Sequence, residues 1–458
     1  MKRCGIEVQL KNKPSLDPDF LPLYRWIEAY KKGAEEKIAV AVERDGGKIA
    51  VLDTCIHGTP GFEEADLYYL ERCIKTLLWA KGGWRVILCG NREIYEKVQK
   101  KYQKGGERSF DFITMGNVYE HPFTVEWRPY EEKPEEKDES LPIGGHLDGC
   151  RIGFDAGGSD RKVSAVVDGK VVYSEEVVWF PKTESDPDYH FRGIVEAFKT
   201  AASKMPRVDA IGVSSAGIYV DNRTMLASLF LKVSPEDFEK KVKDIYIRAA
   251  REIGPVPLLV ANDGDVTALA GAMDLNDTAV LGIAMGTSEA GGYVDAKGNI
   301  TGWLNELAFV PIDASENAAV DEWSGDVGCG VKYFSQDAVI KLAPKAGIEL
   351  DPALSPAEKL KVVQKKANEG AENALDIFRS IGSYLAHTLP LYAGIYDLKH
   401  LLLLGRVTSG RGVEVMLEEA KRVLRDEYPF LSVDLCLPDE KSRRVGQSVA
   451  AAGLPSLN

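Results

Sequence analysis

The hydrophobic and polar positions along this chain switch repeatedly between a two-residue period and a helical period, which is typical of a mixed α/β protein. In the first third, two apolar and β-branched runs flank Asp45-Gly46-Gly47, a composition that predicts a tight hairpin. A longer segment then repeats leucine and isoleucine at helical spacing. We therefore expect strands at 37–42, 48–54 and 85–89, and helices at 63–80 and 92–102.

The pattern repeats on a larger scale after residue 150. Three successive strands with tight turns are followed by a helix and a buried strand, and a second set then follows in a similar order. Strands are expected at 151–155, 162–168, 170–178, 210–214, 258–261, 279–285, 289–294 and 401–405, and helices at 190–204, 266–273 and 413–425. Two such halves, with small and polar residues at the turns after the strands, favour a duplicated α/β fold with a cleft between two lobes.

A charged segment separates the two regions. In residues 131–139, eight of nine residues are charged and the ninth is Pro134. This composition indicates a solvated linker, and an exposed loop inside one domain is the alternative. We expect an N-terminal α/β region of unknown role at 1–130, a charged linker at 131–150, a first lobe at 151–270 and a second lobe at 271–458.

Composition narrows the class of protein. The chain has 458 residues, of which 45% are hydrophobic and 28% charged, as in soluble globular proteins of several domains. The 57 Lys and Arg against 70 Asp and Glu give a net charge of −13. General nucleic-acid binders need surplus cations, so this charge argues against that role.

Location and redox state follow from two further sequence features. No apolar run reaches the roughly 18 residues of a transmembrane helix, and the basic start is not followed by an apolar segment. Seven cysteines occur without a Cys-x-x-Cys pair, which favours reduced thiols over disulfides or a cysteine-rich zinc site. We expect a cytoplasmic protein with no membrane or nucleic-acid partner.

A strand, an acidic residue and a glycine turn follow one another near the start of the first lobe. Asp155 ends the expected strand, and Gly157, Gly158 and Ser159 form the turn. Two glycines allow backbone N–H groups to close on phosphate oxygens, the Ser159 hydroxyl adds a donor, and Asp155 can hold Mg²⁺ through water. A β-hairpin with a glycine turn explains the same residues equally well when they are taken alone.

Further small-residue turns occupy matching places in the second half. Gly286, Thr287 and Ser288 follow an apolar strand there. Because clamping a triphosphate requires a turn on each side, the pair favours phosphate binding over two unrelated hairpins. A glycine turn at 405–410 precedes the last long helix, and its backbone can approach an adenine ring, although such turns are common in α/β proteins.

Residues 262–265, Asn-Asp-Gly-Asp, end a strand and begin a helix of small residues. A carboxylate at this place points into the expected cleft and can take a proton from a substrate hydroxyl. The alternative is that Asp263 or Asp265 only caps the helix, which is the more common role of a lone Asn-Asp pair.

Taken in this order, the segments resemble the ROK (repressor, ORF, kinase) family of the actin, hexokinase and Hsp70 superfamily, over residues 151–455. The resemblance implies duplicated actin-like, ribonuclease H-like ATPase lobes and an ATP-dependent sugar kinase that uses Mg²⁺. It implies that Asp263 is the catalytic base, and that the sugar contacts Ser215, Gly217, Asn262 and Glu306. It also implies that the nucleotide contacts Asp155, Gly157, Gly158, Ser159, Lys162, Gly286, Thr287, Ser288, Gly405 and Arg406, with Mg²⁺ held by Asp155 through water.

The chain departs from the family pattern in two places. Family kinases carry a Gly-Glu-x-Gly-His segment in which Glu binds sugar and His binds zinc, whereas residues 305–309 keep Glu306 and lack the histidine. Of the zinc cysteines only Cys329 remains, and one thiol cannot hold a tetrahedral ion. We therefore expect no zinc and a Glu306 that is positioned by other contacts.

The N-terminal 130 residues lie outside the resemblance. They show no obvious helix-turn-helix of the kind that ROK repressors carry, and their strand order points to a degenerate extra lobe as one explanation.

Three functions therefore stay open. A sugar kinase is favoured by Asp263 and by both glycine turns. A non-catalytic sugar sensor or regulator is an alternative, because the segment at 305–309 is altered and the N-terminal region is extra. An ATPase that acts on a partner protein is the third. The ligand expected for the first two is a small sugar, and a homodimer is a possible assembly.

Overall fold

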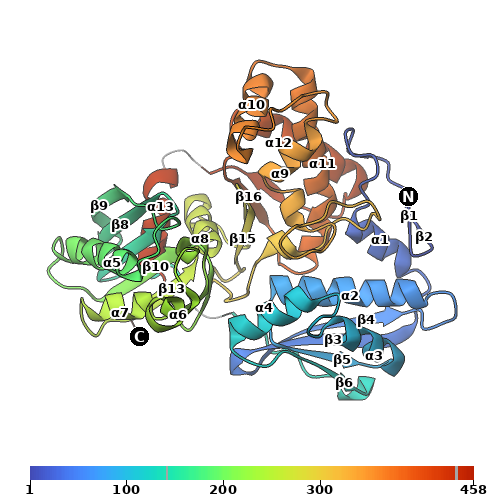
Figure 1. Ribbon diagram of the computed structural model, residues 1–458, viewed down its shortest axis with the longest axis horizontal. Coiled ribbons are helices and arrows are strands. Elements are labelled where there is room, and N and C mark those ends of the chain that lie inside the picture. The colour runs from blue at the N-terminus through green and yellow to red at the C-terminus, as the bar shows by residue number, and fades with distance from the viewer. Residues whose placement is uncertain (141–142, 439–441, 458) are drawn as a thin grey trace.

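The computed structural model describes residues 1–140, 143–438 and 442–457. Three bodies, each built on its own β-sheet, pack around one another (Figure 1). The N-terminal body is blue, the first lobe is green, and the second lobe runs from yellow to orange. The predicted mixed α/β architecture is confirmed.

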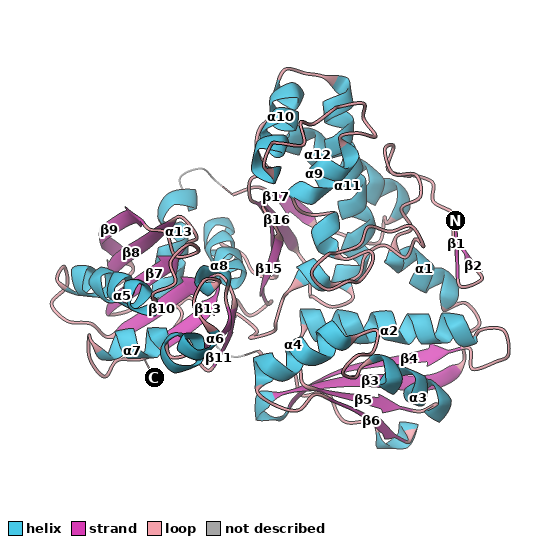
Figure 2. Ribbon diagram, viewed as in Figure 1, coloured by secondary structure: helices cyan, strands magenta, loops and turns pink. Residues whose placement is uncertain are grey.

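The N-terminal body is a four-stranded sheet in the order β4-β3-β5-β6, with α2 and α4 between this sheet and the second lobe (Figure 2). The predicted hairpin, helices and strands are all present, and the helix at 63–80 and the strand at 85–89 match residue for residue. The elements are β1 (Lys2–Arg3), β2 (Ile6–Glu7), α1 (Leu23–Tyr30), β3 (Glu36–Arg44), β4 (Lys48–Ile56), α2 (Glu63–Ala80), β5 (Arg85–Cys89), α3 (Arg92–Lys101), α4 (Ser109–Tyr119) and β6 (Thr124–Arg128).

The first lobe is a five-stranded sheet in the order β13-β10-β7-β8-β9. Strands β7, β8 and β9 are antiparallel neighbours, whereas β10 and β13 run parallel to β7. The elements are β7 (Cys150–Ala156), β8 (Asp160–Val167), β9 (Lys170–Val178), α5 (Pro187–Ala202), β10 (Ala210–Ser215), β11 (Ile218–Val220), β12 (Arg223–Leu226), α6 (Pro235–Asp237), α7 (Ile245–Arg251) and β13 (Leu258–Asn262).

The N-terminal sheet does not repeat this lobe. Strands β3 and β5 are antiparallel, whereas β7 and β10, their counterparts in the first lobe, are parallel. The idea of a degenerate extra lobe is therefore wrong in its topology.

The second lobe contains a four-stranded sheet in the order β15-β14-β16-β17. In the first lobe, a third antiparallel strand, β9, follows the first two. In the second lobe no such strand follows β15 among the described residues; the chain forms turns and short 3-10 helices at Leu307–Phe309 and Gly330–Lys332 before α9. The elements are α8 (Asp263–Leu275), β14 (Val280–Met285), β15 (Glu289–Val294), α9 (Gln336–Leu342), α10 (Pro356–Asn368), α11 (Glu372–Ala393), β16 (His400–Leu404), α12 (Arg411–Glu427), β17 (Asp434–Cys436) and α13 (Ser442–Ala452).

The bodies interlock along the chain. Helix α8 contacts β14 and β15 of the second sheet, and the C-terminal helix α13 returns to pack on β7, β8 and β10 of the first. The predicted boundary at 270 falls inside α8, and the domain limits at 130, 150 and 270 stay a proposal.

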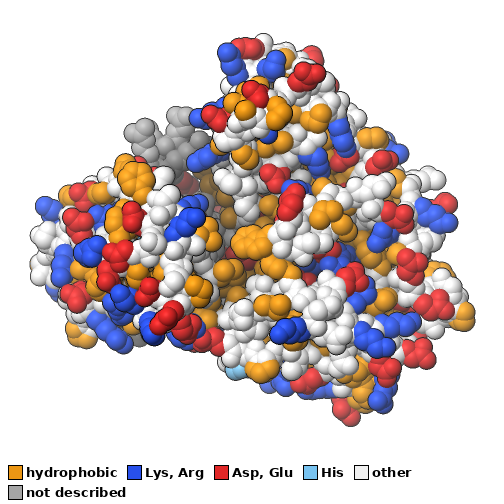
Figure 3. All heavy atoms as spheres, in the orientation of Figure 1, with side chains coloured by type: hydrophobic (Ala, Val, Ile, Leu, Met, Phe, Trp, Pro, Cys, Tyr) orange, Lys and Arg blue, Asp and Glu red, His pale blue; other side chains and the backbone are white. Residues whose placement is uncertain are grey.

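Two large hydrophobic cores divide the molecule unevenly. One continuous core joins the N-terminal body to the second lobe and includes Trp26, Trp79, Phe309 and Tyr384. The first lobe has a separate core between its sheet, α5 and α7. The N-terminal body and the second lobe thus form one packed unit, and a hollow separates that unit from the first lobe (Figure 3). Among the described helices, none has the length and hydropathy to span a bilayer.

The charged segment between the N-terminal body and the first lobe is not wholly solvated, contrary to the expectation. Asp138 is buried, with ion pairs to Arg44 and, at 3.1 Å, to Lys81. The backbone of Lys137 also pairs with Ile49 beside the N-terminal sheet. A charged residue of this segment therefore forms ion pairs with the N-terminal body instead of being solvated.

Candidate active site

Three carboxylates that the sequence singled out come together in the structure. Asp155 is the last residue but one of strand β7 and Asp263 is the first residue of α8. Glu306 directly precedes the short helix at 307–309. Burial, with the charge of Asp263, raises the pKa of Asp155 to about 7 and that of Glu306 to about 7. Burial also raises the pKa of Asp263. Asp263 is therefore coupled electrostatically to both of the other carboxylates.

Two polar side chains that the sequence analysis missed support this cluster. The Ser214 hydroxyl donates to Asp155 Oδ1 at 3.1 Å, and these residues are paired on neighbouring parallel strands. Gln447 Nε2 on α13 donates to Ser214 Oγ at 2.9 Å and to the backbone oxygen of Asp263 at 3.3 Å. Gln447 therefore links the end of β10, where Ser214 meets Asp155, to the start of α8, which carries Asp263.

The first glycine turn, residues 157–159, is hydrogen-bonded to Trp179. The Trp179 indole N–H donates to the carbonyl of Gly157 at 2.7 Å, and its backbone N–H donates to the carbonyl of Ser159 at 3.2 Å. Gly158 and Ser159 are themselves exposed. The turn is thus anchored through its carbonyl groups.

Two lysines flank this turn. Lys162 lies opposite Asp155 in the β7–β8 pair and forms an ion pair with Asp160 at 3.4 Å. Lys182, which the sequence analysis missed, approaches so closely that a Cβ on Gly158 would lie 2.8 Å from its Cε. Its charge also opposes part of the rise that burial causes in the pKa of Asp263. The turn therefore has cations on two sides.

The second glycine turn and the predicted adenine turn lie against each other. Thr287 and Ser288 are exposed at the end of β14. Gly405 has a φ of +93°, and a Cβ there would lie 2.3 Å from the carbonyl oxygen of Met285. The backbone N–H of Val407 donates to the same oxygen at 3.1 Å. Arg406 is exposed beside this contact.

The cap of α8 is Asn262 rather than either aspartate. Asn262 Oδ1 accepts from the backbone N–H of Gly264 at 2.7 Å, and Nδ2 donates to the carbonyl of Gly217 at 2.7 Å. Asp265 is buried and accepts from the backbone N–H of Tyr293 at 3.1 Å. Asp263, in the first turn, is therefore not needed as the cap.

The start of α8, which carries Asp263, contacts the second lobe through Gly264 and Gly292. A Cβ on Gly292 would lie 2.1 Å from the backbone carbon of Gly264. The first turn of α8 therefore touches the backbone of β15 directly, which only glycine permits.

A cavity of about 550 Å³ adjoins this region, within the range of small-molecule sites. Gly217, Asn262, Asp265 and Trp303 line it, together with Lys48 from the N-terminal hairpin. The N-terminal body therefore contributes to the wall of this cavity, which adjoins Asp263 in sequence through Asn262 but does not include Asp263 or Glu306 among its lining residues.

Ser215, expected to contact a sugar, lies elsewhere. Its hydroxyl is buried and accepts from the hydroxyls of Tyr219 at 2.6 Å and Tyr246 at 2.8 Å. Successive strand residues face opposite sides of a sheet, so Ser214 meets Asp155 while Ser215 turns away from it.

A further buried carboxylate, Glu289, lies at the start of strand β15. Neither of its carboxylate oxygens has a hydrogen-bond partner among the described residues, and burial together with the charge of Glu306 raises its pKa. A carboxyl of this kind holds its proton more tightly when folded, so stability is lost as the pH rises above the unfolded pKa near 4.5.

We expect Glu289→Gln to remove this loss. Between the two pKa values the wild type should lose about 1.4 kcal/mol of unfolding free energy per pH unit through this group. Thermal unfolding from pH 5 to 8 should therefore show a flatter pH dependence for Glu289→Gln. The exposed control Glu316→Gln should behave as wild type, and equal slopes in all three proteins would contradict the prediction.

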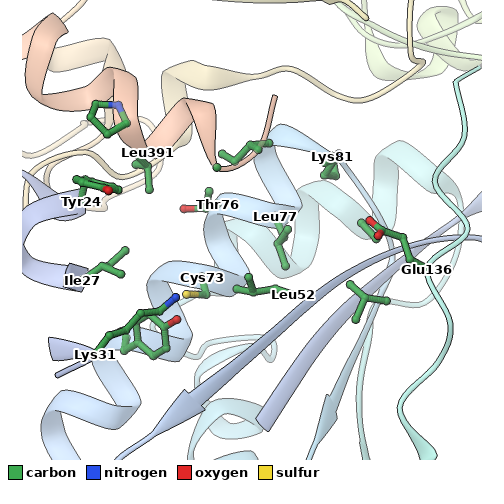
Figure 4. Close-up of a pocket in the computed structure, with 16 residues that line it drawn as sticks. Tyr24, Ile27, Lys31, Leu52, Cys73, Thr76, Leu77, Lys81, Glu136 and Leu391 are labelled. Carbon is green, nitrogen blue, oxygen red and sulfur yellow. The ribbon is translucent and has the colours of Figure 1, made fainter. Parts of the chain in front are cut away.

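A separate cavity of about 320 Å³ contains none of the predicted site residues (Figure 4). It lies between α1, β4, α2 and the end of α11, and its walls are mainly apolar, with Tyr24, Ile27, Leu52, Leu77 and Leu391 among them. It lies between the N-terminal body and α11 of the second lobe, and it is separate from the carboxylates Asp155, Asp263 and Glu306.

Comparison with solved structures identifies the fold. A ROK hexokinase from Thermus thermophilus matches with a TM-score of 0.52 and 17% identity, covering 66% of this chain and 96% of that one. This chain contains the ROK fold. The predicted resemblance and the actin-like ATPase architecture are thereby confirmed at the level of the fold.

Other ROK-fold structures are also similar. A ROK family glucokinase from Streptomyces griseus, in complex with glucose and AMPPNP, matches at a TM-score of 0.48 and 19% identity over 66% of this chain and 98% of that one. A ROK family transcriptional regulator, a homolog of the E. coli MLC protein, matches at 0.49 and 17% over 67% and 78%. No protein-family model and no curated protein matches the sequence.

Proposed function

We propose that this chain is an ATP-dependent kinase that transfers the γ-phosphoryl group of ATP to a sugar hydroxyl. The observation that carries the proposal is the convergence of Asp155, Asp263 and Glu306, each with a raised pKa, together with the glycine turn at 157–159 that directly follows the strand of Asp155. Catalytic acids and bases are found where burial and like charges shift pKa values in this way. The ROK hexokinase with the same fold supports a hexose-like acceptor.

Asp263 is the general base in this proposal. Its carboxylate accepts the proton of the acceptor hydroxyl while the hydroxyl oxygen forms a bond to the γ-phosphorus. The bond from that phosphorus to the β–γ bridging oxygen breaks, and ADP leaves with the electron pair. The raised pKa makes Asp263 a stronger base than an exposed aspartate. Positioning and charge neutralisation supply most of the acceleration.

The nucleotide would lie between the two glycine turns, 157–159 and 286–288. Lys162 and Lys182 would neutralise phosphate oxygens, and the backbone at Gly405 and Arg406 would border the adenine. Mg²⁺ is bound in such sites by one or two carboxylates, substrate phosphates and water, and Asp155 supplies a carboxylate of this kind. When bound, the ion would neutralise charge on the phosphates. Among the described residues, no three His, Cys, Asp or Glu side chains form a metal site by themselves.

The acceptor would lie beside Asp263 and Glu306, next to the cavity that Asn262 and Gly217 line. Glu306 would accept hydrogen bonds from sugar hydroxyls. The Asn262 amide is already bonded to Gly264 and Gly217, so its main contribution is to fix the start of α8, which carries Asp263.

A screen of hexoses, N-acetylhexosamines and sugar acids for ADP release tests the proposal. We expect ADP production that depends on one acceptor class, with one phosphoryl group transferred per ADP. ADP release without any sugar would support an ATPase that acts on a partner protein. Calorimetry that detects sugar binding but no ATP binding would support a sensor.

A further inference from the structure

The last carbonyl groups of α2 hold the segment that carries Glu306. The backbone N–H groups of residues 304–306 donate in order to the carbonyl oxygens of Lys81, Ala80 and Trp79, at 3.3, 3.0 and 2.9 Å. The carbonyls at a helix C-terminus have no partner inside the helix. This ladder satisfies them and fixes the backbone of Glu306 against the N-terminal body.

The side chain of Asn305 extends this connection to the helix that begins with the proposed base. Asn305 Nδ2 donates to Asp265 Oδ1 at 2.8 Å, and its Oδ1 accepts from the Tyr396 hydroxyl at 3.0 Å. Its φ of +52° is a conformation that asparagine tolerates better than most residues. The end of α2, Asn305 and α8 are therefore joined by consecutive hydrogen bonds.

A buried ion cluster clamps the loop that follows Glu306. Asp326 is almost fully buried and forms ion pairs with Arg72 at 3.0 Å, Lys75 at 3.1 Å and Arg108 at 2.7 Å. All three cations belong to the N-terminal body, and their charges lower the pKa of Asp326. Burying so many charges is favourable only when each one is paired.

Aromatic packing also holds the segment after Glu306 against the N-terminal body. The ring of Phe309 lies 4.3 Å from that of Trp79 and 5.4 Å from that of Phe110, measured between centroids. The Trp79 indole N–H donates to Asp111 at 2.7 Å. The other face of α2 lines the cavity of Figure 4, so this helix is buried on several sides.

We propose that the N-terminal body is a fixed wall of the acceptor site, in which the end of α2 and the ion cluster around Asp326 position Glu306. This inference rests on the proposed function, because it assigns Glu306 to the acceptor. Asp326, Arg72 and Arg108 are then positioning residues that act through the 304–330 segment. They supply the contacts expected for a Glu306 without a histidine or zinc beside it.

Asp326→Asn in the full chain tests the role of the cluster. We expect the KM for the acceptor to rise tenfold or more, while the KM for ATP changes less than twofold, because the nucleotide turns lie outside the clamp. Amide hydrogen exchange should show residues 304–306 exchanging as slowly as α2 in the wild type and faster in Asp326→Asn. The matched control is Glu107→Gln, at the exposed edge of the same cluster, which should leave both readouts unchanged.

Several outcomes separate the two proposals. If the wild type phosphorylates no sugar, the proposed function fails, and exchange at 304–306 still decides whether α2 holds this segment. If Asp326→Asn does not fold, the milder Arg108→Gln, which leaves Arg72 and Lys75 on Asp326, should show the same selective rise in acceptor KM. Fast exchange at 304–306 in the wild type, or unchanged acceptor KM in a folded variant, would overturn the inference.

Discussion

Asp263→Asn should lower the kcat of phosphoryl transfer by about 10²–10⁴-fold, which is the usual loss when a general base is removed. The substitution keeps the size of the side chain but cannot accept the hydroxyl proton. It also removes a charge that raises the pKa of Asp155 and of Glu306, so both values should fall. The affinity for ATP should change little, because neither glycine turn is altered. Steady-state kinetics and calorimetry with an ATP analogue measure the two effects.

Asp274→Asn is the matched control for this variant. Asp274 is exposed near the far end of the same helix, so the same chemical change there should leave kcat as in the wild type. A folded Asp263→Asn protein that keeps more than about a tenth of the wild-type kcat would remove Asp263 as the base.

Gly405→Ala should weaken ATP binding by about tenfold or more, corresponding to about 1.4 kcal/mol. The φ of +93° is unfavourable for alanine, and the new Cβ would lie 2.3 Å from the carbonyl oxygen of Met285. The turn must move away from the strand that leads into Gly286, which separates the proposed adenine and phosphate contacts. Titration calorimetry with an ATP analogue gives the change in Kd.

Gly347→Ala separates this displacement from the cost of a positive φ alone. Gly347 has a φ of +69° in the second lobe, and nothing lies within 4 Å of a Cβ there. Its alanine variant should lose some stability and keep the wild-type affinity for ATP. Equal affinities in the Gly405→Ala and Gly347→Ala proteins would show that the turn at 405 is not part of the nucleotide site.

The strands and helices that the sequence predicted have a clear local period, whereas α1, α4 and α13 were not predicted. Helix α2 matches its predicted bounds because its apolar residues recur at helical spacing. Strand β5 matches because its apolar residues form a short unbroken run. Their partners in space were not predictable. Arg72 and Lys75 have the composition of a solvated helix face, but they are buried and pair with Asp326, some 250 residues later in the chain.

The sequence predicted the motifs of the site, but it did not predict which individual side chains contact one another. The turns at 155–159 and 286–288 and the pair Asn262-Asp263 could be found because glycines and acidic residues directly follow apolar strands. The resemblance implied Ser215 as a sugar contact, whereas strand alternation places its neighbour Ser214 beside Asp155. Lys182 and Gln447 could not be found, because they reach the site from a loop and from α13, through contacts that no local pattern records.

A crystal structure of the full chain with Mg²⁺ and AMPPNP would test the central claim most directly. The account predicts the triphosphate between residues 157–159 and 286–288, the adenine beside Gly405, and the γ-phosphorus facing the Asp263 carboxylate. Density for the nucleotide at another place, with this cleft empty at saturating ligand, would contradict it.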